Sequence, residues 1–441
     1  MGETLEQLGG DLAQGRITSE SLVRDRIARI EAENPALLAF TDVFGQQALE
    51  AARQRDDELR RGLRRGPLHG IPLAVKNLAD VEGCVTRFGS RVYGSAPSRR
   101  NAVFVQKLAD AGAVIVGTTH MVEFAIGSWG TNHVLGTPWN PLDRSRHRVP
   151  GGSSSGSAVA VAAALVPAAI GSDTGGSVRI PASLCGVVGF KPSYGAVSNE
   201  GVAPLAPSFD TIGPIVRSVA DARLVHDVIA DVPAGTVEVD PSAIRIGLVD
   251  GDQLAPMDTL VAQSFAEAGA LIAGQCGLAE RFRFPQDMTS CQQMSGEIMA
   301  HEAYRHLARL VDDGRRPMDP FVRERVRAGR AVSDERYHEL LRMRQAMIHA
   351  FEPTFASFDF LVMPTTPRPA IPLDEVDEAL VPMSRFTRPA NLLNLCAISI
   401  PVRAGGGLPA GLQIVGKAGD DARLLGFAAH VEAMLAGAAA R

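Results

Sequence analysis

A pair of glycines directly before a serine, in the run Thr174-Gly175-Gly176-Ser177, is the segment of this sequence best suited to covalent chemistry. Glycine tolerates backbone angles that other residues avoid, so the successive amides of such a run can converge into an anion-binding nest. Acyl transfer needs such amides for its tetrahedral oxyanion. We therefore predict that Thr174, Gly175, Gly176 and Ser177 form an oxyanion hole and that Ser177 is a nucleophile. A phosphate site is the alternative, but no GxxxxGK[ST] pattern follows the run.

A serine hydroxyl is a weak nucleophile and needs a base, for which two arrangements compete. In the first, the run Gly152-Ser153-Ser154-Ser155-Gly156 satisfies the pattern GxSxG, with Ser154 as nucleophile. That pattern belongs on a strand-turn-helix elbow, however, and a run this rich in serine and glycine matches it by chance. The second arrangement uses a lysine that burial keeps neutral.

Lys76 is the candidate for that lysine, because it ends the apolar run Ile71–Val75 and is one of only four lysines among 44 basic residues. Burial lowers the pKa of a lysine. A fall from about 10.4 to about 7 favours the neutral amine by roughly 4–5 kcal/mol. Arginine stays protonated at any working pH and could not replace it.

These segments are part of a longer pattern. Its parts are His69–Lys76, Gly151–Ser157, Gly171–Ala182, Gly189–Gly195, Asp210–Pro214 and Gly407–Gln413. In this order they closely resemble the amidase signature family, and the resemblance covers most of the chain. It implies an amidohydrolase that cleaves the C–N bond of a carboxamide through an acyl-enzyme, without a cofactor or a metal ion.

The resemblance also implies roles for individual residues. Ser177 matches the family's nucleophile, Lys76 its general base, and Ser153 the bridging serine, which the family holds on a cis peptide bond. Ser154 is the neighbour expected to form a hydrogen bond with these three residues. Asn77 follows the lysine where many relatives have aspartate, a feature shared with branches that act on small ureido or biuret-type substrates.

Two further charged residues match family positions, and neither is expected to take part in the chemistry. Asp173 and Arg179 should form a salt bridge or hydrogen-bond frame for the nest. For the substrate pocket we expect apolar walls from Met121, Phe124 and Trp129. Three arginines are candidates to pair with a substrate carboxylate, and the sequence does not choose among them: Arg368, Arg385 and Arg388.

Short apolar runs alternate with helical patterns, which predicts an α/β fold to position these residues. The predicted strands include Ile71–Val75, Ala113–Gly117, Ile244–Val249, Phe358–Met363 and Gly411–Val415. The predicted helices include one that begins at Thr18 or Ser19 and ends before Pro35, an alanine-rich one between the two Gly/Ser runs, Thr259–Ala273, and Asp421–Leu435.

The family resemblance sharpens this expectation to one large mixed β-sheet with helices on both faces. No linker divides the sequence, so we predict a single domain over residues 1–441. Its signature core spans about 65–215, and a charge-rich helical segment at about 285–355 covers the core.

The main hypothesis is a hydrolase of small carboxamides that acts alone, with a variant that acts on ureido or biuret-type amides. A second is the glutaminase subunit of a tRNA-dependent amidotransferase, which would need partner subunits. A third, from another class, is a scaffold without catalysis, although Lys76, Ser153 and Ser177 are all present.

Composition limits the partners. The 441 residues carry 44 basic and 49 acidic side chains. The resulting net charge of −5 does not favour binding to nucleic acid or to an anionic membrane. The first residues are acidic and include no apolar run, so we expect no signal peptide. No apolar run is long enough to span a bilayer, and the five cysteines form no CxxC pair. We therefore expect a cytoplasmic enzyme whose partner is a small amide and whose assembly is compatible with a homodimer.

Overall fold

The strands of the computed structural model, which describes residues 3–380, 382–402 and 407–439, join into one mixed sheet. The strands are β1 (Phe40–Val43), β2 (Pro72–Lys76), β3 (Val114–Thr119), β4 (Ala168–Asp173), β5 (Val188–Lys191), β6 (Thr211–Val216), β7 (Arg245–Val249), β8 (Leu278–Phe282), β9 (Phe360–Pro364), β10 (Cys396–Val402) and β11 (Ala410–Gly416). Their order in the sheet is β1-β3-β2-β4-β6-β5-β10-β11-β9-β7-β8.

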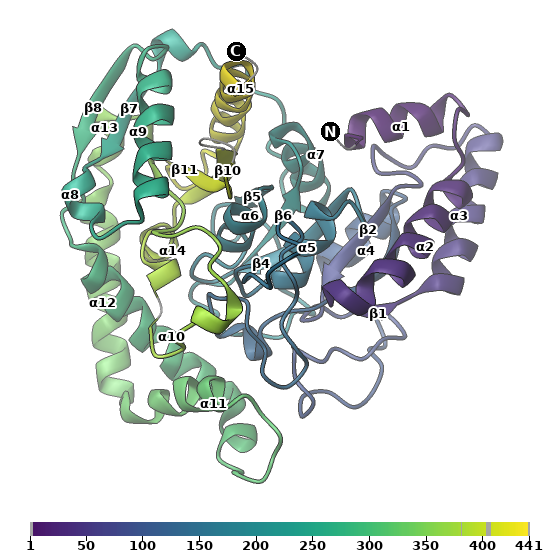
Figure 1. The fold of residues 1–441 in the computed structure, drawn as a ribbon, viewed down its shortest axis with the longest axis horizontal. Helices are drawn as coiled ribbons and strands as arrows, with labels where there is room; N and C mark the ends of the chain where they lie inside the picture. Colours follow the sequence, from purple (N-terminus) through teal and green to yellow (C-terminus); the bar gives the residue numbers. More distant parts are fainter. Residues whose placement is uncertain (1–2, 381, 403–406, 440–441) are drawn as a thin grey trace.

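Helices cover both faces of this sheet (Figure 1). They are α1 (Leu5–Ala13), α2 (Ser19–Leu37), α3 (Gly45–Arg60), α4 (Val103–Asp110), α5 (Ser155–Ala162), α6 (Arg179–Cys185), α7 (Val219–Ile229), α8 (Gly251–Leu254), α9 (Thr259–Ala273), α10 (Met288–Val311), α11 (Pro320–Arg327), α12 (Asp334–Phe351), α13 (Thr354–Ser357), α14 (Arg388–Leu392) and α15 (Asp421–Ala439). Short 3-10 turns lie at η1 (Glu123–Ala125), η2 (Pro241–Ala243), η3 (Ala328–Ala331), η4 (Leu373–Glu375) and η5 (Pro382–Ser384). The predicted fold class, a mixed sheet between helical layers, is confirmed.

Strand β2 illustrates why the sheet must be covered on both sides. All five of its residues are buried. Leu73 and Val75 belong to the core cluster shared with α4, α7 and α15, whereas Ala74 belongs to the cluster shared with α2, α3 and α5. Because successive side chains of a strand point to opposite faces, both faces of β2 need an apolar cover.

The positions of β2 and β4 bring the chemical segments together. The two strands are parallel neighbours, with Val75 opposite Ile170. Lys76 therefore ends β2 beside Ser172 and Asp173, which end β4. In open α/β sheets this carboxyl edge is where ligands usually bind.

The alanine-rich helix is confirmed as α5, and its composition follows from close packing. Every residue from Ser155 to Val161 is buried. A Cβ atom on Gly156 would overlap the backbone carbonyl oxygen of Ala39 and crowd the backbone of His120. Only small residues allow the helix to approach the strands this closely, so the segment is no flexible linker.

One predicted boundary is wrong. Helix α2 does not end before Pro35 but continues to Leu37, and Leu38 closes it in the left-handed conformation by donating its N–H to the Asn34 carbonyl. Leu37 is buried in the core. A proline this close to the end of a helix interrupts little of its hydrogen bonding, and the buried leucine favours one more turn.

The charge-rich segment forms α10 to α13, of which α10, α11 and α12 lie in the lower left part of Figure 1. Buried side chains of α10, α11 and α12 share a core cluster with Met121 and Phe124. This layer therefore supports the loop that follows β3.

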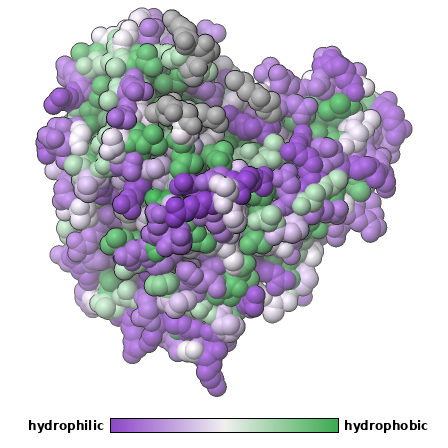
Figure 2. Space-filling model, in the orientation of Figure 1, coloured by the Kyte–Doolittle hydropathy of each residue, from purple (hydrophilic) through white to green (hydrophobic). Residues whose placement is uncertain are grey.

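Hydrophilic and hydrophobic residues are interspersed on the face of the molecule drawn in Figure 2. Within the described ranges, no helix is both long enough and apolar enough to cross a membrane.

Replacing Gly213 by alanine should lower the thermal unfolding midpoint. Gly213 lies in β6, where a Cβ atom would overlap the Phe190 carbonyl oxygen of β5. Forcing atoms into a packed core costs about 1–3 kcal/mol. The control is Gly10→Ala in α1, where a Cβ atom meets nothing within 4 Å, and where alanine should stabilise the helix by about 0.5–1 kcal/mol. Calorimetry of both variants checks this, and an unchanged midpoint for Gly213→Ala would contradict it.

Candidate active site

Lys76 lies at the centre of a group of hydroxyls. Its side chain is 1% exposed. Its Nζ donates to Ser153 Oγ at 2.7 Å and to Ser172 Oγ at 2.8 Å. The sequence predicted the lysine and Ser153, but it assigned Ser172 no role. The available signal was the position of Ser172 at the end of a strand, two residues before the nest.

Burial determines the protonation of this lysine. Desolvation lowers the pKa of Lys76 to about 7, against the charges of Asp173 and Asp210, which raise it. A substantial fraction of the amine is therefore neutral at pH 7 and can accept a proton. An exposed lysine would be almost entirely protonated at this pH.

The loops that carry Ser153 and Ser177 are joined through their backbones. The Gly152–Ser153 peptide bond is cis. The N–H of Ser154 donates to the Ser177 carbonyl at 3.2 Å, and the N–H of Val122 donates to the Ser153 carbonyl at 3.1 Å. Ser177 is 8% exposed and lines a cavity.

Ser154 does not occupy the place that the elbow arrangement requires. It is fully buried, and its Oγ donates to the Ser172 carbonyl at 3.2 Å and accepts from the Ser172 N–H at 3.3 Å. Its hydroxyl thus connects α5 to β4, and Ser154 does not line the cavity, whereas Ser177 does.

The nest is organised around the carboxylate of Asp173. Oδ1 of Asp173 accepts from the Gly176 N–H at 2.8 Å, and Oδ2 accepts from the Val178 N–H at 3.2 Å. One of the four predicted oxyanion donors, the Gly176 amide, is therefore already engaged by this carboxylate. Gly176 has a φ of 124°, and a Cβ atom there would overlap Thr387.

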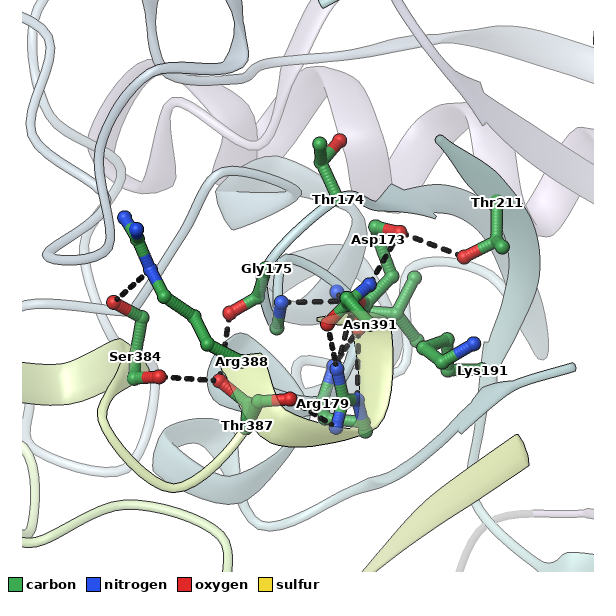
Figure 3. Close-up of polar contacts among 12 residues, drawn as sticks. Asp173, Thr174, Gly175, Arg179, Lys191, Thr211, Ser384, Thr387, Arg388 and Asn391 are labelled. Atoms are coloured by element: carbon green, nitrogen blue, oxygen red, sulfur yellow. Dashed lines mark hydrogen bonds and ion pairs between the residues drawn. The ribbon is translucent and has the colours of Figure 1, made fainter. Parts of the chain in front are cut away.

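Asp173 and Arg179 form an ion pair with no solvent exposure (Figure 3). Arg179 Nε donates to Asp173 Oδ2 at 3.0 Å and Nη2 donates to Oδ1 at 2.9 Å. Burial raises the pKa of Asp173, but the charge and hydrogen bonds of Arg179 outweigh this and hold it well below its usual range. The carboxylate is therefore ionised at every pH at which the protein would work.

Three residues from distant parts of the chain complete this frame. Asn391 Nδ2 donates to Asp173 Oδ1 at 3.0 Å, and Gln413 Oε1 accepts from Arg179 Nη1 at 2.6 Å. Thr387 Oγ1 donates to the Gly175 carbonyl at 2.7 Å. The C-terminal part of the chain thus holds both the ion pair and the nest.

A second buried carboxylate, which the sequence did not single out, holds the first residue of the nest. Asp210 Oδ1 accepts from Thr174 Oγ1 at 2.6 Å. Oδ2 accepts from the N–H groups of Leu205 and Ala206 at 3.0 and 3.1 Å. Burial raises the pKa of Asp210 to about 6. Its place in the matching Asp210–Pro214 segment was the available signal.

The cavity beside Ser177 has a volume of about 70 Å³. Its lining consists of Ala125, Ile126, Gly127, Ser128, Thr174, Gly175, Ser177, Ile180, Leu205, Met299, Arg325, Ser384 and Arg388. Met121, Phe124 and Trp129, which we expected to form the walls of the substrate pocket, do not line this cavity. All three are at most 2% exposed.

These large side chains pack into the core behind the cavity wall. The Phe124 ring packs against the rings of Phe88 and Tyr93, with centroid distances of 5.6 and 6.2 Å. Trp129 Nε1 donates to the Leu380 carbonyl at 3.0 Å. The smaller residues between them, from Ala125 to Ser128, are left to form the wall.

Of the three candidate arginines, Arg388 lines the cavity. Arg368 is exposed, and Arg385 donates to backbone carbonyls, among them that of Ala255 at 2.9 Å. Arg325 also lines the cavity and was not predicted. Asn77 does not reach it, since its amide donates to Thr118 Oγ1 at 2.7 Å and accepts from the Arg87 N–H at 2.8 Å.

Comparison with known proteins finds a matching family and similar relatives. A family model described as Amidase matches residues 21–425. A glutamyl-tRNA(Gln) amidotransferase subunit of Acidothermus cellulolyticus is 36% identical, over 98% of this chain and 94% of the relative.

Two solved structures are also similar. One, described as an amidase, has a TM-score of 0.90 and 34% identity and covers 98% of this chain and 100% of its own. A glutamyl-tRNA(Gln) amidotransferase subunit from Thermotoga maritima has a TM-score of 0.77 and 31% identity, over 92% of this chain and 90% of its own. The family model and these likenesses span almost the whole sequence, and we conclude that the chain belongs to the amidase family.

Proposed function

We propose that this protein hydrolyses the C–N bond of a small carboxamide through an acyl-enzyme on Ser177. The observation that carries the proposal is the contact of 2.7 Å between Ser153 Oγ and Lys76 Nζ, in a lysine whose pKa burial lowers to about 7. A neutral amine that is hydrogen-bonded to a serine hydroxyl can act as its general base.

The proposed reaction begins with two proton transfers. Neutral Lys76 accepts the proton of Ser153 Oγ, and Ser153 Oγ accepts the proton of Ser177 Oγ. Ser177 Oγ then attacks the amide carbonyl carbon, and the carbonyl oxygen becomes an oxyanion. We assign the oxyanion to the amides of Thr174, Gly175 and Ser177, since the Gly176 amide donates to Asp173.

The relay then runs in reverse. A proton returns through Ser153 to the leaving nitrogen, the C–N bond breaks, and ammonia or an amine departs. A water molecule gives a proton to the same relay and attacks the acyl-enzyme, which releases the carboxylate product and regenerates Ser177. The hydroxyl of Ser172, the second hydrogen-bond partner of Lys76, keeps Nζ oriented during these steps.

A second candidate is the hydrolysis of glutamine as one component of an amidotransferase. The names of the curated relatives support it more directly than the first candidate, and this chain covers 94% of the length of the Acidothermus cellulolyticus subunit. The high similarity to a structure described as an amidase supports the first candidate. The chemistry at Ser177 is the same in both. The hydrogen bond between Lys76 and Ser153 argues against a scaffold without catalysis.

Ser177→Ala should abolish the release of ammonia from amides without loss of fold, because the acyl-enzyme can no longer form. The expected loss is on the order of 10⁶-fold, the scale for removal of a serine nucleophile. An ammonia assay over aliphatic, aromatic, ureido and amino-acid amides, with the purified chain alone, provides the measurement. Glutamine hydrolysis that appears only with co-purified partners would identify the second candidate.

The surface variant Ser145→Ala, at an exposed position, is the control and should keep full activity. Mass spectrometry after fluorophosphonate treatment should find the label on Ser177. A label on Ser154, or full turnover by Ser177→Ala, would exclude the proposed mechanism.

The activity should depend on the protonation of Lys76. Because the base must be neutral and its pKa is about 7, kcat/KM should fall as the pH decreases below about 7. Lys76→Arg should be nearly inactive at every pH, since arginine keeps its proton. Initial rates measured over about pH 5 to 9 test both statements.

Lys191→Met is the matched control. Lys191 is also a fully buried lysine at the end of a strand, but its Nζ donates to the Pro192 carbonyl at 2.8 Å, away from the two serines. This variant should lose thermal stability and keep the same acid limb. Rapid turnover by Lys76→Arg would show that another group is the base.

A further inference from the structure

Two arginines line the cavity beside Ser177, and they differ in whether a carboxylate neutralises their charge. Arg325 has a carboxylate partner, since its Nη2 donates to Glu378 Oε2 at 2.8 Å. Arg388 forms no ion pair with any acidic residue in the described ranges. Its Nε donates to Ser384 Oγ at 3.1 Å, and its Nη1 donates to the Gln292 carbonyl at 2.9 Å and to Ser295 Oγ at 3.2 Å.

These neutral partners orient the guanidinium of Arg388 but leave its charge unbalanced. They occupy Nε and Nη1, so the two N–H groups of Nη2 are the donors that remain. Burial and the charge of Arg325 lower the pKa of Arg388 to about 10, and the side chain therefore stays charged at neutral pH. The side chain is part-buried, and a charge partly withdrawn from water is stabilised by an ion of opposite sign.

Arg388 lies directly beside the nest. A Cβ atom placed on Gly175 would be 3.5 Å from Arg388 Cγ and 3.6 Å from its Nε. Figure 3 shows Arg388 beside Gly175. Ser177 and Arg388 both line the cavity, so an acyl group on Ser177 would extend into a space bordered by this side chain.

Ser128 adds a second, independent feature on the same cavity. The residue is 7% exposed, and its Oγ is buried without a hydrogen-bond partner among the described residues. An unpaired hydroxyl of this kind costs free energy unless a ligand or a water molecule satisfies it. It can donate to an anionic oxygen.

We propose that this cavity binds a carboxylate on the acyl part of the substrate, with Arg388 as its charged partner and Ser128 as a hydrogen-bond donor. The substrate class is then the monoamide of a short dicarboxylic acid. Arginine pairs with carboxylates through charge-assisted hydrogen bonds, which are stronger than those to neutral groups. This inference rests on the proposed function, whose scissile amide it places at Ser177.

The lining also indicates what the substrate lacks. Among the described residues it contains arginines but no acidic side chain, and the nearby Glu378 is already paired with Arg325. A free ammonium group on the substrate would have no carboxylate partner and would face two cations. The cavity volume of about 70 Å³ favours a short chain. We therefore expect a monoanion to be preferred over a zwitterion such as glutamine.

The first test uses labelling of Ser177 by a fluorophosphonate, which needs no substrate. Malonate, succinate and glutarate should each be compared with the corresponding neutral diamide for slowing of the labelling. At least one dicarboxylate should protect the wild-type protein more than its diamide does. Arg388→Gln should weaken this protection by about 10- to 100-fold, the range for a hydrogen bond to a charged group.

Arg388→Lys keeps the charge and should retain part of the protection. Arg368→Gln, at an exposed position outside the cavity, is the matched control and should protect like the wild type. Each variant is compared with itself, as the ratio of labelling rates with and without the dicarboxylate, so a change in its own reactivity does not matter. Should Arg388→Gln fail to fold, Arg388→Lys and Ser128→Ala carry the comparison.

The second test is turnover of matched amides. Glutaramate and L-glutamine differ only in the α-ammonium group, and glutaramate and glutaramide differ only in the charge of the far end. We expect kcat/KM for glutaramate, or for the shorter monoamides malonamate or succinamate, to exceed that of the neutral diamide and of glutamine at least 10-fold.

The outcomes distinguish a failure of the carboxylate site from a failure of the hydrolase activity. If Ser177 is labelled but dicarboxylates protect no better than diamides, or if Arg388→Gln protects like the wild type, the carboxylate site is wrong and the hydrolase stands. A preference for glutamine over glutaramate would also overturn the inference. If no fluorophosphonate reacts with Ser177 and no amide is hydrolysed, the proposed function itself fails.

Discussion

The buried ion pair between Asp173 and Arg179 is the interaction on which the candidate active site depends. Neither side chain is exposed to solvent. A buried ion pair contributes little net stability by itself, because the cost of desolvation offsets the attraction. Its contribution here is geometric: the carboxylate orders the amides of Gly176 and Val178, and the guanidinium reaches Asn391 and Gln413. Remote parts of the chain thereby hold the loop that presents Ser177.

The same pair influences the base. The carboxylate of Asp173 favours the protonated form of Lys76, and burial opposes it. Because Arg179 lies against that carboxylate, much of its negative charge is compensated before it reaches the lysine. The resulting pKa, near 7, allows the amine both to accept and to return a proton. Burial thus sets the low pKa of the lysine, and the carboxylate that frames the nest partly opposes it.

Residue types and spacing were sufficient for the elements of the fold with strong local patterns, such as β2, α5 and α9, and they singled out Lys76; the role expected of Ser153 came from the family resemblance. They did not indicate the direction of side chains. Met121, Phe124 and Trp129 are large and lie in the right loop, but they turn into the core, and the small residues between them face the cavity. Ser172 and Arg325 acquire their roles only through contacts across the sheet and between layers.

Strand β10 was also not predicted, and Pro401 shows why. A proline in a short apolar run argues against a central strand, yet β10 lies between β5 and β11. Its pairing with β5 covers only Ala397 to Ser399, so Pro401 pairs with Gly411 alone and needs no second partner. The strand is central along part of its length and an edge along the rest, which a linear pattern cannot express.

The late position of β10 and β11 in the sequence has a consequence for biosynthesis. A nascent chain that ends before residue 396 would contain Ser177, Lys76 and Asp173, but not Gln413. It would also leave β5 and β9 as open edges in the middle of the sheet, and unpaired strand edges promote aggregation. We expect the enzyme to become active only when synthesis is nearly complete. Truncated chains should aggregate or be degraded and should not act as weak enzymes.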